Sequence, residues 1–128
     1  MNAAVETVDG TWLVDLETED LLDAVIEFPD TKQVDVTLPL VIATAGAGAT
    51  IVAVVDRRPP LAISHDAGMT WREAGGGLPK GTAVAIDEDN PDRMLYAARN
   101  RLFISKDGGR FWLALTLELP EIRAVAFI

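Results

Sequence analysis

Two short stretches of the sequence decide the fold. Residues 61–71 read Leu-Ala-Ile-Ser-His-Asp-Ala-Gly-Met-Thr-Trp, and residues 102–112 read Leu-Phe-Ile-Ser-Lys-Asp-Gly-Gly-Arg-Phe-Trp. The residues that the two stretches share recur after 41 positions, from Ser64 to Ser105 and from Trp71 to Trp112. A fixed period of this length predicts a chain assembled from repeated supersecondary units.

Each stretch carries one turn motif. The first turn motif consists of Ser64, Asp66, Gly68, Thr70 and Trp71. The second turn motif consists of Ser105, Asp107, Gly109 and Trp112, with Phe111 in place of the threonine. An apolar run followed by Asp, Gly and an aromatic residue is typical of a β-hairpin, in which Asp bonds the nearby backbone and Gly adopts positive φ. We therefore expect these residues to have structural rather than catalytic or metal-binding roles.

The pattern Ser-x-Asp-x-Gly-x-Thr-Trp resembles the Asp-box, also called the BNR repeat, of sialidase-like and photosystem-assembly-factor-like β-propellers. The first turn motif matches this pattern in full, and the second departs from it only at Phe111. The resemblance covers roughly residue 38 to the end of the sequence. It implies an all-β fold in which four antiparallel strands form each propeller blade.

The two repeats each predict one blade. In the second repeat, residues 77–117, the expected strands are Thr82–Asp87, Arg93–Arg99, Leu102–Ser105 and Phe111–Thr116. In the first repeat, residues 36–76, they are about Val36–Ala45, Thr50–Asp56, Leu61–Ser64 and Thr70–Ala74. Clusters of turn-forming residues separate the strands in both repeats.

The two ends of the sequence predict complementary parts of a further blade. Residues 118–128 align with the start of a repeat, so Ala124–Phe127 is expected to be a lone first strand. Residues 1–35 are expected to supply the other three strands, because Asp9–Val14 aligns with Arg99–Ile104 at an offset of 90. A short helix at Glu19–Glu27 is an open alternative, since short apolar runs fit either structure. Residues 1–128 then form a single domain of about three blades, a half-propeller.

Three blades are expected to need a partner, because propellers close with about four to eight blades. A lone apolar strand also invites pairing with another chain. We therefore predict that two copies exchange their terminal strands and close a six-bladed homodimer with two-fold symmetry. A heteromeric protein that completes the propeller is the alternative partner.

Composition narrows the function. Hydrophobic residues make up 49% and charged residues 24% of the 128 residues, which favours one packed domain over disorder. There is no cysteine, which excludes disulfides and thiolate metal sites, and the single histidine, His65, disfavours a histidine metal site or a Ser-His-Asp triad. The net charge of −9 argues against nucleic acid as a partner. We expect no metal and no cofactor.

We expect a cytoplasmic protein without a membrane segment. The first ten residues lack the basic and apolar regions of a signal peptide. Leu38–Val55 carries no charge and is long enough to be considered as a membrane span. However, the repeat aligns its end with the charged segment Arg93–Ala97, and Gly46 and Gly48 interrupt it where a turn is needed.

Charges are expected to separate between the two faces of the propeller. The face with the turn motifs would carry Asp66, Asp87, Glu88, Asp89, Asp92 and Asp107, and the opposite face would carry Lys32, Arg57, Arg58, Lys80, Arg99 and Arg101. In sialidases, which the repeat resembles, an arginine cluster opposite the Asp-boxes grips a carboxylate, and the guanidinium fork suits that task. The candidate anion- or acidic-peptide-binding surface therefore consists of Arg57, Arg58, Arg99 and Arg101. Ordinary solvated surface charge is the competing interpretation.

Three further patterns favour structure over chemistry. Tyr96 lies in an expected strand, and no pair of carboxylates stands out for glycoside hydrolysis. Asp87–Asp92 offers oxygen ligands for calcium, but its Asn-Pro-Asp sequence is typical of a turn. The tryptophans could form a sugar platform, but two of them belong to the turn motifs, which favours packing.

The sequence thus predicts a non-enzymatic protein-interaction or scaffold module. The alternative is a sialidase-like carbohydrate-binding or glycoside-active protein that uses the arginine cluster.

Overall fold

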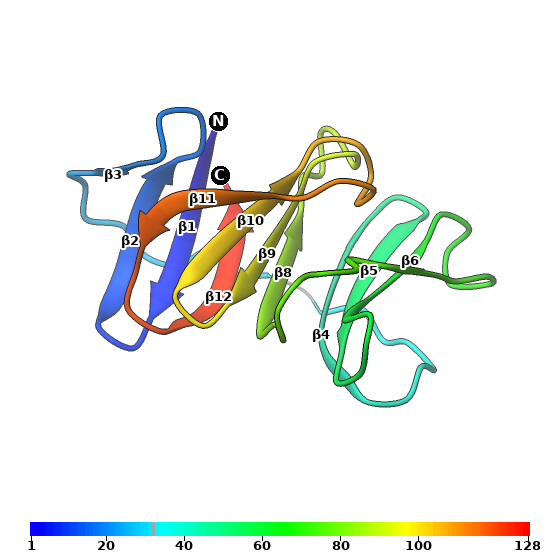
Figure 1. The fold of residues 1–128 in the computed structure, drawn as a ribbon. Helices are drawn as coiled ribbons and strands as arrows, with labels where there is room; N and C mark the ends of the chain where they lie inside the picture. Colours follow the sequence, from blue (N-terminus) through cyan, green and yellow to red (C-terminus); the bar gives the residue numbers. More distant parts are fainter. Residues whose placement is uncertain (32) are drawn as a thin grey trace.

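The structure is a computed structural model that describes residues 1–31 and 33–128; Lys32, one of the expected basic residues, lies outside the described residues. Those residues contain twelve strands and no helix, so they offer no helix able to cross a membrane. The strands form three four-stranded antiparallel sheets (Figure 1). The all-β prediction is confirmed, and the three sheets are consistent with a propeller-like arrangement.

Each of the two repeats forms one sheet. The first-repeat sheet contains β4 (Val41–Ala47), β5 (Thr50–Val55), β6 (Leu61–Ser64) and β7 (Arg72–Ala74). The middle sheet contains β8 (Ala83–Ile86), β9 (Met94–Ala98), β10 (Arg101–Ser105) and β11 (Leu113–Glu118). The main difference from the predicted strands is that β4 begins at Val41 and not near Val36. Pro39 has no N–H to donate to a ladder, and Leu40 has a φ of 61°, so the extended ladder cannot start before them.

The third sheet joins the two ends of the sequence, and we call it the closing sheet. Its strands are, in spatial order, β12 (Ile122–Phe127), β1 (Asn2–Thr7), β2 (Gly10–Asp15) and β3 (Asp20–Leu22). Ala3 lies opposite Phe127 and Val5 lies opposite Val125 in the antiparallel β1–β12 ladder. The prediction that the last strand has no partner within its own chain is therefore wrong. Strand β1 of the same chain pairs with it directly, without an exchange between copies.

The register of the closing sheet differs by one residue from the predicted offset. Thr7 pairs with Gly10 across the β1–β2 hairpin, as Ala98 pairs with Arg101 across the β9–β10 hairpin, which makes the offset 91. A shift of one residue moves every side chain to the other face of a strand. Trp12 consequently corresponds to Phe103, and both rings pack against a core cluster. The helix alternative for residues 19–27 is also wrong, since β3 begins at Asp20.

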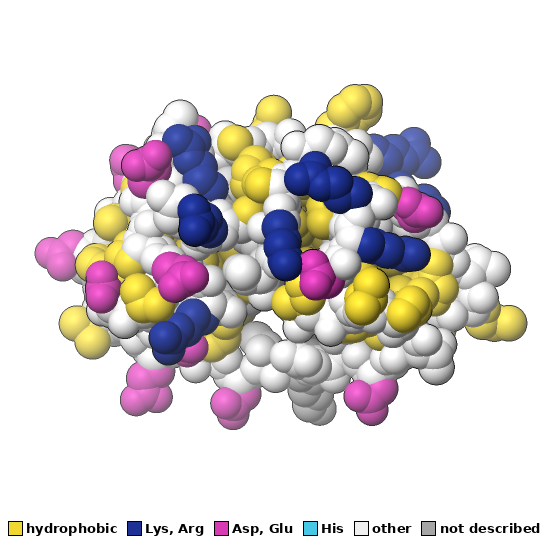
Figure 2. All heavy atoms as spheres, turned by 60° about the horizontal axis from the view of Figure 1, so that its bottom comes forward, with side chains coloured by type: hydrophobic (Ala, Val, Ile, Leu, Met, Phe, Trp, Pro, Cys, Tyr) yellow, Lys and Arg dark blue, Asp and Glu magenta, His cyan; other side chains and the backbone are white. Residues whose placement is uncertain are grey.

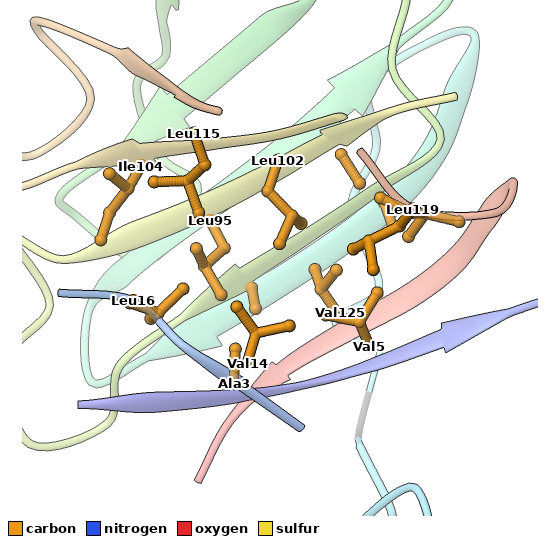
Figure 3. Close-up of a cluster of buried hydrophobic side chains, with 14 residues drawn as sticks. Ala3, Val5, Val14, Leu16, Leu95, Leu102, Ile104, Leu115, Leu119 and Val125 are labelled. Carbon is orange, nitrogen blue, oxygen red and sulfur yellow. The ribbon is translucent and has the colours of Figure 1, made fainter. Parts of the chain in front are cut away.

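Two hydrophobic clusters hold the sheets together, and the middle sheet contributes to both. On one face, Leu95, Leu102 and Ile104 pack against the closing sheet at Val5 and Val14 (Figure 3). On the other face, β9 packs against β5 and β6 of the first-repeat sheet. Strand β8 contacts both β4 and β12, so the first strands of the three sheets lie side by side.

The segment between β3 and β4 runs from the closing sheet to the first-repeat sheet, at the other end of the molecule (Figure 1). Val34 fixes it to β4, because the Thr44 hydroxyl accepts from the Val34 N–H at 2.7 Å and donates to the Val34 carbonyl at 2.9 Å. A Cβ at Gly46 would stand 2.9 Å from the Val34 side chain, so the close approach needs a glycine there. The segment also borders a cavity of about 980 Å³ whose other walls include β4, β8 and β12.

Candidate functional site

The first turn motif bonds its polar side chains to its own loop. Ser64 is buried at the end of β6, where its hydroxyl donates to Asp66 Oδ1 at 2.7 Å and accepts from the Gly68 N–H at 2.8 Å. Asp66 accepts from the Thr70 N–H at 2.8 Å and also from the Thr70 hydroxyl. Each polar group that the sequence singled out in this motif therefore has a partner inside the turn.

The second turn motif repeats this network with one substitution, because a bond from the Arg110 N–H stands in place of the threonine hydroxyl bond. Ser105 donates to Asp107 Oδ1 at 2.9 Å and accepts from the Gly109 N–H at 2.9 Å. The carboxylate accepts from the backbone N–H of Phe111 at 3.0 Å and of Arg110 at 3.2 Å. The Phe111 side chain has no hydroxyl to offer and stands 77% exposed to solvent. The backbone bonds are thus kept, and only the side-chain bond of the threonine is lost.

The turn hydrogen bonds favour the ionised form of both aspartates. The Thr70 hydroxyl and N–H, with the Ser64 hydroxyl, lower the pKa of Asp66 to about 2. The Phe111 N–H lowers the pKa of Asp107, with smaller contributions from Ser105 and Arg110. Neither carboxyl is shifted toward neutrality, which is the direction that a general acid working near neutral pH needs.

The tryptophans pack in separate places. The Trp112 indole N–H donates to the Gly109 carbonyl at 3.0 Å, and its ring meets Tyr96 edge-on with centroids 6.0 Å apart. The Trp12 indole donates to the Thr7 hydroxyl at 3.2 Å and packs against the other core cluster. The side chains of Trp12 and Trp112 thus serve two different sheet interfaces and not one sugar platform.

The acidic turn between β8 and β9 bonds to itself. Asp87 accepts from the Asp89 N–H at 2.9 Å, Asn90 accepts from the Asp92 N–H at 3.2 Å, and Arg93 lies 3.7 Å from Asp87. Within residues 1–31 and 33–128, no group of three or more His, Asp or Glu side chains is placed to hold a metal ion.

Two of the four candidate arginines border a pocket. Arg99 and Arg101, at the β9–β10 turn, line a pocket of about 540 Å³, whereas Arg57 and Arg58, at the β5–β6 turn, are not among its lining residues. Figure 2 looks at the face that carries these turns and shows Lys and Arg side chains over its centre, with acidic side chains among them. We name this pocket the turn pocket.

The walls of the turn pocket come from two sheets and are mostly apolar. Ile42 of β4 is 39% exposed and faces the pocket together with Phe103 of β10 and Ala98 of β9. Pro79 and Gly81, from the link between the two repeats, complete the apolar lining. Because β4 and β10 belong to different sheets, the pocket exists only when the two sheets are packed.

The cations around the turn pocket differ in how they are engaged. Lys80 Nζ lies 2.9 Å from Asp56 Oδ1, and Arg101 Nη2 lies 3.1 Å from Glu118 Oε1. Arg99 has no ion pair with any residue that the structure describes. Its φ of 57° places it in the left-handed region that few residues with a Cβ adopt.

Tyr96 supports a wall of the turn pocket from inside. The buried hydroxyl donates to the Pro79 carbonyl at 2.6 Å, and burial raises the pKa of Tyr96 to about 12. A Cβ at Gly81 would lie only 2.2 Å from the Tyr96 ring, so this ring fixes the path of the link. Such a tyrosine is a packing residue, as the sequence predicts, and its hydroxyl is not free to act as a nucleophile.

Several residues of the turn pocket have no signal in the sequence. Ile42 lies in a charge-free run that only predicts burial, and Phe103 reads as one more apolar residue of a strand. Gly81 is one of several glycines in the link between the repeats, and the sequence does not show that this glycine is the one that packs against the Tyr96 ring. The single histidine, His65, is exposed and lies 3.3 Å from the Thr50 hydroxyl, away from this pocket.

No family model matches the chain, and no curated protein matches it either. The Asp-box resemblance therefore stays a prediction that the two turn motifs carry by themselves.

Proposed function

We propose that this chain is a non-enzymatic protein-interaction module of the Asp-box propeller type, and that it binds through the face carrying the β5–β6 and β9–β10 turns. The observation that carries the proposal is the turn pocket, a concave site of about 540 Å³ with apolar walls and cationic groups at its edge. Recognition sites usually combine an apolar lining with a few placed polar groups in this way.

The turn motifs fit the role of a scaffold for this face. Their serines and aspartates form hydrogen bonds within their own loops, which stabilises the turns on the face opposite the turn pocket. Loops held on a rigid scaffold are the usual place for binding residues. The opposite β9–β10 turn carries Arg99, which has no ion pair among the described residues and can bind a partner at the edge of the turn pocket.

The sialidase-like alternative has less support. The four arginines do not line one common pocket, and the Tyr96 hydroxyl is buried and bonded to the Pro79 carbonyl. Glycoside hydrolysis also calls for two carboxyl groups held about 5–9.5 Å apart across a substrate. The carboxylates of Asp66, Asp87 and Asp107 instead accept backbone N–H groups of their own turns.

A peptide-mapping experiment tests the proposed face. The ¹⁵N-labelled chain is titrated with short peptides of acidic, basic, apolar and proline-rich composition while amide resonances are followed. We expect shifts at Gly81, Arg99 and Phe103 with at least one peptide class. A panel that shifts no amide of this face, or shifts only amides of the turn motifs, would reject the proposal.

A separate proposal concerns assembly: two copies form a ring of six sheets as a homodimer. Exposed apolar side chains near the two ends of the row of sheets favour it, namely Leu21 of β3, Val25 just after it and Leu40 just before β4. Burying such side chains is the usual source of association energy. Because β12 pairs with β1 of its own chain, the contact would join sheet faces and not exchanged strands.

Light scattering after gel filtration tests the assembly. A homodimer has twice the 13.8 kDa mass of one chain, and Val25→Glu with Leu40→Glu should return it to the single-chain mass. Met69→Glu is the matched control, because Met69 is also exposed but lies in the first turn motif. A wild-type chain that elutes with the single-chain mass would reject the homodimer.

A further inference from the structure

We infer that the turn pocket takes a carboxylate that stands next to a bulky apolar side chain in a segment of another protein, with Arg99 binding the carboxylate. This inference rests on the proposed function and names the class of partner for the same face. Four features of the pocket carry it: its lining, its charge, the backbone at Arg99 and the way its walls are held.

The lining of the pocket favours binding of an apolar group. Ile42, Phe103, Pro79 and Ala98 present hydrocarbon to the hollow, and Ile42 is 39% exposed although it belongs to a strand. The volume of about 540 Å³ falls in the range of roughly 300–1,000 Å³ that small-ligand sites occupy. Filling the hollow with an apolar side chain would remove this surface from water.

The charges around the pocket favour binding of one carboxylate. Of the three cations that line it, Lys80 is paired with Asp56 and Arg101 is paired with Glu118. Arg99 is left without an ion pair among the residues that the structure describes. Its planar guanidinium can bind both oxygens of a carboxylate at once, which a second lysine could not do.

The backbone at Arg99 points the same way. With φ at 57°, Arg99 occupies a turn position that glycine or asparagine adopts with less strain. Strained non-glycine residues tend to cluster at binding sites, where the function of the side chain outweighs the cost of the backbone strain. The strain at Arg99 is therefore consistent with a side chain held out for a ligand.

The walls are also fixed in advance. Tyr96 holds the Pro79 carbonyl at 2.6 Å, and the Arg99 carbonyl accepts from the Ile122 N–H at 2.6 Å. A site whose groups are already in place loses little entropy when a ligand binds. Ile122 belongs to β12, so the closing sheet holds the turn that carries Arg99.

The carboxylate can come from a chain end or from an Asp or Glu side chain, because the chemistry is the same. Three fluorescein-labelled probes separate these sources: Gly-Ser-Gly-Ser-Gly-Phe with a free carboxyl end, the same peptide with an amide end, and amidated Gly-Ser-Glu-Phe-Gly-Ser. The fourth and fifth probes are variants of the third peptide: the fourth replaces its Glu by Gln, and the fifth replaces its Phe by Ala. Binding is measured by fluorescence anisotropy.

We expect at least one carboxylate probe to bind, and its amide or Gln counterpart to bind about tenfold more weakly or worse, as the loss of a charge-assisted hydrogen bond implies. The Phe-to-Ala probe should lose affinity as well. Arg99→Gly should weaken the binding about tenfold while leaving the melting temperature unchanged or higher, because glycine fits the φ of this position. Arg110→Gln, which removes an exposed arginine from the second turn motif, is the matched control and should bind as the wild type does.

The outcomes separate this inference from the proposed function. If peptides bind the face in the amide-mapping experiment but neither the carboxylate nor Arg99 affects their affinity, the carboxylate inference is wrong and the interaction module stands. If no peptide binds the face at all, both proposals fail. Ile42→Ala gives a second check, since this half-exposed side chain can be shortened with little loss of core, and unchanged affinity would contradict the apolar half of the inference.

Discussion

The two turn motifs have nearly the same hydrogen bonds but different surroundings. In both, a serine caps a glycine N–H and an aspartate collects N–H groups four residues on. The second motif belongs to the middle sheet, where Gly109 lies against Ile63 of the neighbouring sheet. At the first motif, the atoms nearest to a Cβ on Gly68 belong to Trp71 and Ile51 of its own sheet.

The difference shows which parts of the motif the fold itself demands. The bonds to backbone N–H groups occur in both motifs and do not depend on whether residue 70 or its counterpart is a threonine. The threonine hydroxyl adds a bond that the second motif does without. What the second motif has instead is contact with a neighbouring sheet, so its glycine and tryptophan should matter more for stability.

The largest expected effect comes from the two glycines. Gly68 and Gly109 have φ values of 89° and 88°, so alanine strains the backbone equally at both. A Cβ at 109 would stand 2.4 Å from Ile63 Cδ1, whereas at 68 its nearest neighbour would be 3.6 Å away. We expect Gly109→Ala to lower the free energy of unfolding by about 1–3 kcal/mol more than Gly68→Ala, measured by urea denaturation. Adding Ile63→Val should recover part of the loss; equal losses at the two glycines would break the comparison.

The next effect concerns the tryptophans. Trp112→Phe removes the indole bond to the Gly109 carbonyl and weakens the contact with Tyr96. Among the residues that the structure describes, indole hydrogen bonds are made by Trp12 and Trp112 and not by Trp71. Trp112→Phe should therefore cost about 1 kcal/mol more than Trp71→Phe in the same denaturation experiment. A larger cost at Trp71 would contradict the comparison, because the tryptophan of the first motif would then contribute more to stability than that of the second.

The third effect is a dependence on pH. The pKa of Asp66 is about 2 in the folded chain against an ordinary value of 3.8, so its ionised form is bound more tightly by the fold than its neutral form. Its contribution to stability is complete above pH 3.8 and is lost as the pH falls toward 2. Thr70→Val should raise the pKa of Asp66 and reduce the acid sensitivity in this window, and Phe111→Thr should lower the pKa of Asp107 further. Carboxyl titration by NMR measures both, and unchanged values would show that the hydroxyl is irrelevant.

The smallest effect concerns a turn position with left-handed backbone, at which the two motifs have different residues. Ala67 has a φ of 59°, and its counterpart Gly108 has a φ of 74°. Ala67→Gly relieves the strain but makes the unfolded chain more flexible, so we expect a net gain of about 0.5 kcal/mol. Gly108→Ala should cost a similar amount. Thermal unfolding measures both, and a loss of stability in Ala67→Gly would show that the turn is not strained.

The sequence predicts the repeats well because each carries a motif that anchors its register. Ser64 and Ser105 end their strands as expected, and the middle sheet differs from the predicted strands by only one or two residues at most ends. The closing sheet has no such anchor, since its turn lost the motif. There Asp15 accepts the N–H groups of Glu17 and Thr18 instead, and the predicted offset of 90 is wrong by one residue.

The pairing of β12 with β1 was half visible in the sequence. The three strands at the start and the single strand at the end are complementary, but periodicity does not say whether the complement lies in the same chain or in a second copy. The turn pocket is less visible in the sequence, which places Lys80 on this face and marks only Arg99 and Arg101 of the lining as candidate binding residues. Its apolar walls come from residues that are distant in sequence, such as Ile42 and Phe103, and only packing brings them together.

The β1–β12 ladder also orders events during synthesis. The two repeat sheets are built from neighbouring hairpins and can form as they leave the ribosome. Strand β12 is made more than a hundred residues after β1, so the edge of β1 that pairs with it has no partner while the residues between them are translated. An exposed edge of this kind is what chaperones protect and what nascent chains aggregate through. The docking of β12 is therefore the step that covers this edge of β1 and completes the closing sheet.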